Sequence, residues 1–188
     1  MSTYSRPTPA YALAALLLIG AIGCTEEGDP VYLDEESPAF SMHGQGAGGA
    51  TAATINEDLA TLRRLLAPFH RLEVAMDAGW DELLTPCLEN PPEGGMGFHY
   101  ANEELLDGEV NLLEPEALLF APWPNGDVKF VAVEYIVPIG AWEGEDPPTL
   151  LGQEFGLNEP AGIWALHIWL WQHNPSGLFA DWNPRISC

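Results

Sequence analysis

The sequence predicts an α+β domain in which one long helix packs on an antiparallel β-sheet. Apolar residues recur at steps of three and four through residues 59–76, which is the period of a helix. From Gly94 onward the chain consists of short β-rich runs interrupted by proline and glycine. Asn125 and Gly126 separate two of these runs and favour a tight hairpin turn. A helix followed by consecutive strands is typical of the α+β class.

The helix is expected to begin at Thr54, because Thr54 and Glu57 have the spacing of a capping box. Gly79 is well placed to end it. Pro68 lies inside this segment, and an interior proline removes a backbone donor, so we expect a kink near residues 66–67. The stripe that faces the core consists of Leu59, Leu62, Leu66, Phe69, Leu72 and Met76.

The sheet is expected to contain a hairpin of residues 117–121 and 127–137, a strand at residues 162–172 and another around residues 97–100. Residues 141–160 lie between two of these strands and carry many acids and prolines, so we predict an irregular excursion. The two-residue period of a strand sorts side chains by face. One predicted face consists of Val128, Phe130, Ala132, Glu134 and Ile136.

Glu134 is thus a carboxylate in an apolar row, and burying it unpaired would be costly. His167 lies in a second apolar row, and His99 lies on a third strand beside Gly97. If neighbouring strands bring His99, Glu134 and His167 together, they form a set that suits Zn²⁺, Fe²⁺ or Cu²⁺ with open positions for water or substrate. The alternative is a hydrogen-bonded core pair of Glu134 with one histidine or with Tyr100. No HExxH or HxH motif decides between the two interpretations.

Residues 10–24, AYALAALLLIGAIGC, resemble a bacterial lipoprotein signal peptide. The apolar run is shorter than the roughly 20 residues of a spanning helix, Arg6 precedes it, and Cys24 ends a lipobox-like sequence. We therefore predict export, removal of residues 1–23, and a lipid on Cys24 that attaches the protein to the membrane. Thr25 favours the outer membrane if the host is Gram-negative. Cleavage by ordinary signal peptidase, or retention as a weak membrane anchor, is the alternative.

Residues 24–53 are acidic and rich in glycine, and we interpret them as a flexible tether. Residues 54–188 then form a single domain. In an oxidising compartment Cys87 and Cys188 are expected to form a disulfide that closes a loop of about 100 residues. Two free thiols, or a metal thiolate, are the alternatives.

The chain carries 28 acidic and 6 basic residues, for a net charge of −22. This charge disfavours nucleic acid and anionic lipid head groups as partners of the protein surface, whereas cations are compatible with it. The sequence also lacks a Gly-x-Ser-x-Gly elbow and a phosphate-binding loop.

Seven tryptophans suggest a second kind of site, an aromatic surface or cleft for a cell-envelope glycan, a peptide or a small apolar ligand. Trp123 and Trp142 fall in loops and are the expected exposed pair. Ordinary packing is the alternative for all seven.

Four segments carry a resemblance to a family: residues 95–100 (GMGFHY), 115–122 (PEALLFAP), 131–138 (VAVEYIVP) and 166–188 (LHIWLWQHNPSGLFADWNPRISC). They resemble an uncharacterised family of bacterial secreted or lipoprotein domains over roughly residues 87–188. The resemblance implies an extracytoplasmic domain and assigns no catalytic residues. The expected function is that of a lipid-anchored binding or scaffolding module. The alternative is a metal-dependent enzyme or metal-binding protein that uses His99, Glu134 and His167.

Overall fold

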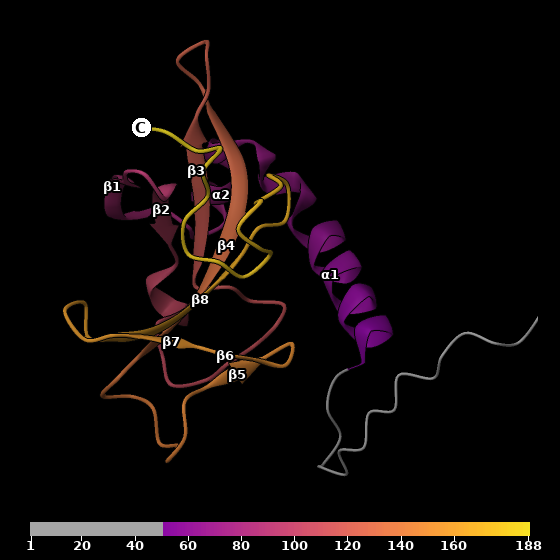
Figure 1. Ribbon diagram of the computed structural model, residues 1–188, viewed down its shortest axis with the longest axis vertical. Helices are drawn as coiled ribbons and strands as arrows, with labels where there is room; N and C mark the ends of the chain where they lie inside the picture. The colour runs from indigo at the N-terminus through magenta and orange to yellow at the C-terminus, as the bar shows by residue number, and fades with distance from the viewer. Residues whose placement is uncertain (1–50) are drawn as a thin grey trace, which may run out of the picture. The chain divides into compact units, whose positions relative to one another are not determined.

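The computed structural model describes residues 51–188, which form an antiparallel sheet with helices on one face (Figure 1). The predicted α+β class is therefore confirmed. The predicted signal peptide, the lipidated Cys24 and nearly all of the predicted tether lie outside the described residues. Within residues 51–188 no helix is long and apolar enough to cross a membrane.

Six strands form the main sheet in the order β1-β2-β3-β4-β8-β7, and every neighbouring pair is antiparallel. The two remaining strands, β5 and β6, pair only with each other. The strands are β1 (Glu82–Asn90), β2 (Gly94–Ala101), β3 (Ala117–Pro122), β4 (Val128–Pro138), β5 (Thr149–Leu150), β6 (Gln153–Glu154), β7 (Gly156–Asn158) and β8 (Ile163–Ile168). The predicted hairpin is thus β3–β4. The predicted irregular excursion contains the short strands β5, β6 and β7, so that prediction is wrong in part.

The N-cap of helix α1 (Ala52–Leu66) lies three residues before the predicted cap. Thr51 is its N-cap, and the Thr51 hydroxyl accepts a hydrogen bond from the backbone N–H of Thr54 at 3.2 Å. The hydroxyl of Thr54 donates to the carbonyl of Thr51 at 2.8 Å. Thr51 and Thr54 both carry the hydroxyl that an N-cap needs. In the structure Thr51 is the cap, because its hydroxyl accepts from a free backbone N–H of the first turn.

The predicted single helix is divided into three segments at Pro68. Helix α1 ends at Leu66, the 3₁₀ turn η1 (Ala67–His70) follows, and α2 (Leu72–Asp77) ends before Gly79, whose φ is +107°. The break changes which side chains face the sheet. Ala75 is fully buried, whereas Met76 is 40 % exposed, so its predicted place in the core stripe is wrong.

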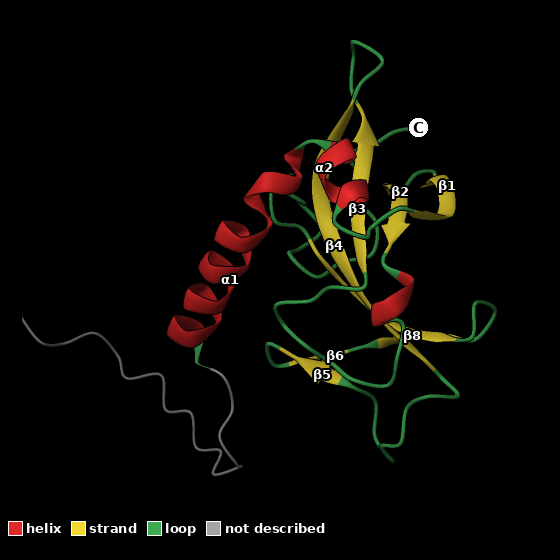
Figure 2. Ribbon diagram, turned by 180° about the vertical axis from the view of Figure 1, so that it is seen from behind, coloured by secondary structure: helices red, strands yellow, loops and turns green. Residues whose placement is uncertain are grey.

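The helices and the sheet share one apolar core, which we call the helix-side core. Figure 2 shows the helices on the near face of the sheet. The buried members of the helix-side core include Leu59, Leu62, Leu66 and Ala75 from the helices, and Leu118, Phe120, Phe130, Val133, Tyr135, Val137, Leu166 and Ile168 from the strands. Burial of these large side chains is the main source of stability for such a packing.

A β-bulge at Val131 reverses the alternation of β4. Leu119 pairs with Ala132 and Phe120 pairs with Phe130, so Val131 has no opposite residue on β3. Phe130 therefore lies in the helix-side core, whereas Val131 and Ala132 both lie in a second cluster. The predicted face is correct from Ala132 onward and wrong for Val128 and Phe130.

The second cluster lies on the face of the sheet away from the helices and is covered by the C-terminal segment, residues 169–188. It consists of Ala101, Ala117, Leu119, Ala121, Val131, Ala132, Ile136, Trp169 and Ile186. In Figure 1 this segment, in yellow, passes in front of β3 and β4. The predicted strand at residues 162–172 ends at Ile168, where the C-terminal segment begins. Within this segment, the backbone of Asn183 exchanges two hydrogen bonds with that of Gly95 on β2, each of 3.1 Å.

Strand β1 was not predicted from the sequence. It is an edge strand with three register irregularities against β2, it contains Pro86, and most of its side chains are exposed or partly exposed. Its residues therefore show no clear apolar alternation. The predicted disulfide between Cys87 of β1 and Cys188 is present, and it joins the end of the C-terminal segment to this edge.

Candidate metal centre

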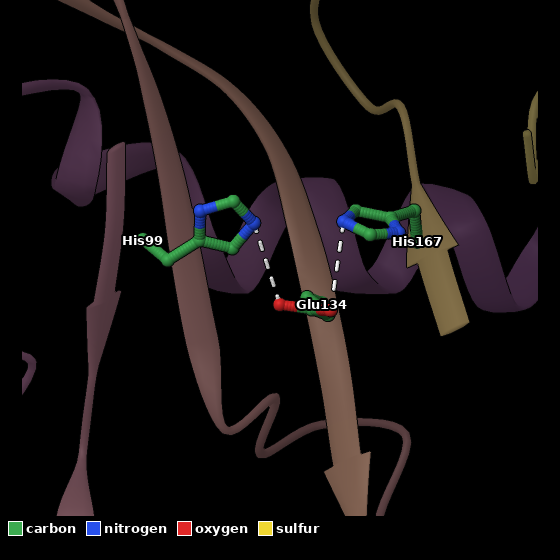
Figure 3. A group of neighbouring side chains, drawn as sticks. All are labelled: His99, Glu134 and His167. Carbon is green, nitrogen blue, oxygen red and sulfur yellow. Dashed lines mark ion pairs between the residues drawn. The ribbon is translucent and has the colours of Figure 1, made fainter. Parts of the chain in front are cut away.

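Three strands bring His99, Glu134 and His167 together on the face away from the helices (Figure 3). His99 comes from β2, Glu134 from β4 and His167 from β8, and none is more than 7 % exposed. Each contributes one potential ligand atom, and the three atoms lie within 4.8 Å of one another. The juxtaposition predicted from the sequence is therefore present.

Strand pairing explains part of this arrangement. Glu134 pairs directly with His167 across β4 and β8. His99 is separated from β4 by the intervening strand β3, where Ala117 pairs with Glu134. Strands are about 4.8 Å apart, so an imidazole on β2 must pass over one strand to reach β4. The methyl side chain of Ala117 leaves the space that a larger residue would fill.

The distances within the group do not correspond to hydrogen bonds. Nε2 of His99 lies 3.5 Å from Oε2 of Glu134, and Nε2 of His167 lies 3.6 Å from Oε1. Hydrogen bonds between such atoms are usually 2.7–3.2 Å. In place of the predicted hydrogen-bonded core pair, Glu134 makes a longer ion-pair contact with each histidine. Tyr100 is also not a partner, because it packs against the helix-side core on the other face.

His167 is the least satisfied polar side chain of the group. It is 3 % exposed, and neither of its ring nitrogens has a hydrogen-bond partner. Buried polar atoms without partners are rare and costly in folded proteins. In Figure 3 its Nε2 and that of His99 face Glu134 from opposite sides. With both Nε2 atoms unprotonated, their lone pairs and the carboxylate would form the donor set of a divalent metal ion.

The outer ring nitrogens of both histidines face groups that set their orientation. Nδ1 of His99 lies 2.8 Å from the hydroxyl of Thr85 on β1. Nδ1 of His167 lies 3.4 Å from Oδ1 of Asp181 in the C-terminal segment, a charge contact longer than a well-formed hydrogen bond. Metal-binding histidines usually donate their other N–H to an oxygen of this kind. A proton on each Nδ1 would leave each Nε2 lone pair free for a metal.

Charge and burial affect the two histidines differently. Burial lowers the pKa of His99 below its ordinary value, although the nearby Glu134 opposes this shift. Burial also lowers the pKa of His167, but the carboxylates of Glu134 and Asp181 outweigh it, so that the net pKa is raised. The facing His167 in turn lowers the pKa of Asp181. The surroundings of His167 therefore favour positive charge, whereas those of His99 favour the neutral imidazole.

A cavity of about 630 Å³ opens above the group. His99, Glu134 and His167 line its floor, and its walls are mostly apolar. Two wall residues, Leu84 and Leu157, are 41 % and 49 % exposed and stand where the cavity meets solvent. The volume lies within the usual range of small-molecule sites.

The structure does not bring Trp123 and Trp142 into one cleft. Trp123 lies in the β3–β4 turn, where Lys129 stands 4.6 Å from its ring centroid. Trp142 follows the other end of β4, and its indole N–H donates to the carbonyl of Asp146 at 2.8 Å. The eleven residues of β4 separate them by about 35 Å. A role for either residue in ligand binding stays a prediction.

Sequence reasoning missed Thr85 and Asp181. Thr85 lies on the unpredicted strand β1, and Asp181 lies in a turn of the C-terminal segment. The only available signal was the disulfide, since Cys87 and Cys188 place both segments near each other. Comparison of the chain with models of protein families, with curated proteins and with solved structures found no match.

Proposed function

We propose that this protein is an exported domain, anchored to the cell envelope by a lipid on Cys24, that binds one divalent transition-metal ion through His99, Glu134 and His167. The observation that carries the metal proposal is the spacing of the ligand atoms around a buried His167 whose ring nitrogens have no hydrogen-bond partner. Binding of a metal, rather than scaffolding alone, is the function that this geometry supports best.

The spacing suits a metal better than a hydrogen bond. Ligands about 2.0–2.1 Å from a tetrahedral ion lie roughly 3.3 Å from one another. The two nitrogen–oxygen distances are 3.5 and 3.6 Å, each to a different oxygen of Glu134, and the three ligand atoms lie within 4.8 Å of one another. An approach of the two imidazoles toward one carboxylate oxygen would complete the set. Zn²⁺ fits two histidines and one carboxylate, and Fe²⁺ and Cu²⁺ share these donors.

Three protein ligands leave coordination positions open, and the cavity gives those positions access to solvent. A bound ion would act there as a Lewis acid, which activates water or polarises a coordinated oxygen. This is the basis of the metal-dependent enzyme interpretation. Binding and transport of the ion need only the three ligands.

The metal proposal is tested by titrating the purified domain with Zn²⁺ after chelator treatment. We expect one equivalent to bind, and the melting temperature to rise with Zn²⁺ concentration because the ion binds the folded state alone. His167→Ala should weaken binding by at least 100-fold. Glu134→Gln keeps the size of the side chain and removes its charge, and it should also weaken binding strongly.

The matched control is His173→Ala, because the His173 side chain is exposed and lies outside the group. This variant should bind Zn²⁺ as the wild type does. Absence of saturable binding by the wild type, or equal loss in His173→Ala and His167→Ala, would contradict the proposal.

The anchor is tested separately, by mass spectrometry of the N-terminal peptide from membranes of the native host. We expect an acylated Cys24 as the first residue, and we expect Cys24→Ser to abolish the acylation and leave the protein unprocessed. An unmodified Cys24 in membrane-associated wild-type protein would rule out this part of the proposal.

A further inference from the structure

The cavity above the metal ligands has an apolar wall and a polar floor. Its wall includes Leu84, Leu88, Met96, Leu157 and Ile163, which come from four different strands. Its polar lining includes the three side chains of the proposed centre together with Thr85, Asn158 and Asp181. Such a division, with few polar groups at fixed positions inside an apolar wall, is typical of a site that binds a small molecule.

The exposed leucines at the mouth indicate where the body of a ligand would lie. Leu84 on β1 and Leu157 on β7 are about half exposed although they belong to opposite edges of the sheet. An occupant of the cavity would remove both from water at once. Apolar burial of this kind favours binding by roughly 25 cal/mol for each Å².

The charges of the proposed metal ion and its ligands indicate which charge the head group of a ligand would carry. A divalent ion held by one carboxylate and two neutral imidazoles keeps one unit of positive charge. Among the described residues that line the cavity, none is a lysine or an arginine. An anionic head group therefore has a single positively charged partner in this cavity, the ion itself, and the carboxylates of Glu134 and Asp181 would repel it when the ion is absent.

We infer that the cavity binds a small molecule with an apolar body and one anionic head group, and that the head group coordinates the metal ion proposed above, on which this inference rests. Medium-chain carboxylates are the simplest members of this class. Binding should consequently need both the ion and the apolar wall. An anionic head group without a chain makes no contact with the apolar wall, and an uncharged chain does not coordinate the ion through an anionic group.

The probe is decanoate below its micelle concentration, added to protein loaded with Co²⁺, and it is compared with acetate and with decanol. We expect decanoate to bind at least tenfold more tightly than either, and to change the visible absorption spectrum of Co²⁺ because it enters the coordination sphere. Removal of the ion should abolish this binding. Decanoate that binds metal-free protein equally well, or that leaves the spectrum unchanged, would overturn the inference.

Wall variants test the apolar part. Leu84→Ser combined with Leu157→Ser should weaken decanoate binding about tenfold and leave Co²⁺ binding unchanged. The matched control is Leu83→Ser combined with Leu113→Ser, because these leucines are 46 % and 41 % exposed and lie outside the cavity. Equal effects of the two pairs would overturn the inference. Failure of the wild type to bind Co²⁺ would contradict the proposed metal-binding function itself. Normal Co²⁺ binding with no preference for decanoate over acetate would contradict only the inference about the ligand.

Discussion

Glu116 is a second buried carboxyl group, and it lies outside the metal centre. It is 2 % exposed, and its Oε2 accepts a hydrogen bond from the backbone N–H of Ile136 at 3.0 Å. Burial raises the pKa of Glu116 to about 8, and the nearby carboxylates of Asp107 and Glu134 contribute to the rise. Glu116 is therefore protonated in the folded protein at neutral pH.

This protonation predicts a pH dependence of stability. Between pH 4.5 and about 8 the folded state keeps a proton that the unfolded state has lost, so the free energy of unfolding falls as the pH rises. We expect Glu116→Gln to remove this part of the slope and to be more stable than the wild type near pH 8, by up to a few kcal/mol. Urea unfolding at pH 4.5, 6 and 8 measures the difference.

The control for this prediction is Glu104→Gln, because Glu104 is exposed. Its pH slope should equal that of the wild type. If Glu116→Gln also keeps the wild-type slope, ionisation of Glu116 does not limit stability at high pH.

At the scale of single elements, the sheet depends on close contact between β2 and β3. Gly97 has a φ of +97°, and a Cβ built at this position would lie 2.5 Å from the carbonyl oxygen of Phe120. A side chain here would both strain the backbone and push two central strands apart.

We therefore expect Gly97→Ala to lower the free energy of unfolding by about 2–4 kcal/mol. It should also weaken metal binding, because His99 is two residues away on the same strand. Gly140→Ala is the matched control, since Gly140 has open space around its Cβ position and a negative φ. Thermal unfolding and Zn²⁺ titration of both variants measure these effects. Equal stability of the two variants would show that β2 and β3 can separate without cost.

The elements that carry the metal ligands could be predicted, whereas their supporting contacts could not. The alternation around Glu134 and His167 survives in β4 and β8, so strand period alone places both in apolar rows. The bulge at Val131 could not be predicted, because no glycine or proline marks it in the sequence. Its position is set by the pairing of β4 with β3 and by contacts with the C-terminal segment. The carbonyl of Val131 accepts from the backbone N–H groups of Trp171 and Gln172 at 3.2 and 3.3 Å.

Strand β1 was missed and the place of Met76 was predicted wrongly, each for a separate structural reason. The place of β1 beside β2, and hence the contact of Thr85 with His99, follows from tertiary pairing of an irregular strand. The exposure of Met76 follows from the break at Pro68, after which the helical period starts again at a new angle.

For the molecule as a whole, the C-terminal segment connects the core, the metal centre and the edge of the sheet. It contributes Trp169 and Ile186 to the second cluster, places Asp181 beside His167, and ends in the disulfide to Cys87. The disulfide joins residues 101 positions apart, so it constrains most of the unfolded domain.

Replacing both cysteines by serine should therefore lower the free energy of unfolding by about 4 kcal/mol in the chain-entropy model. Denaturant unfolding of Cys87→Ser combined with Cys188→Ser measures the loss. Wild-type protein treated with a reductant is the control and should lose a similar amount. A double variant as stable as the oxidised wild type would contradict the entropic contribution assigned to this crosslink.

The irregular pairing of β1 also affects how copies of the protein meet. An open strand edge presents free N–H and C=O groups to which a second chain can add, and such addition leads to aggregation. Here Pro86 lacks one donor, three register shifts interrupt the line of the remaining groups, and the opposite edge, β7, is only three residues long. Neither border of the described sheet offers a continuous template for intermolecular β-pairing, so we expect this fold to disfavour fibril formation at high protein concentration.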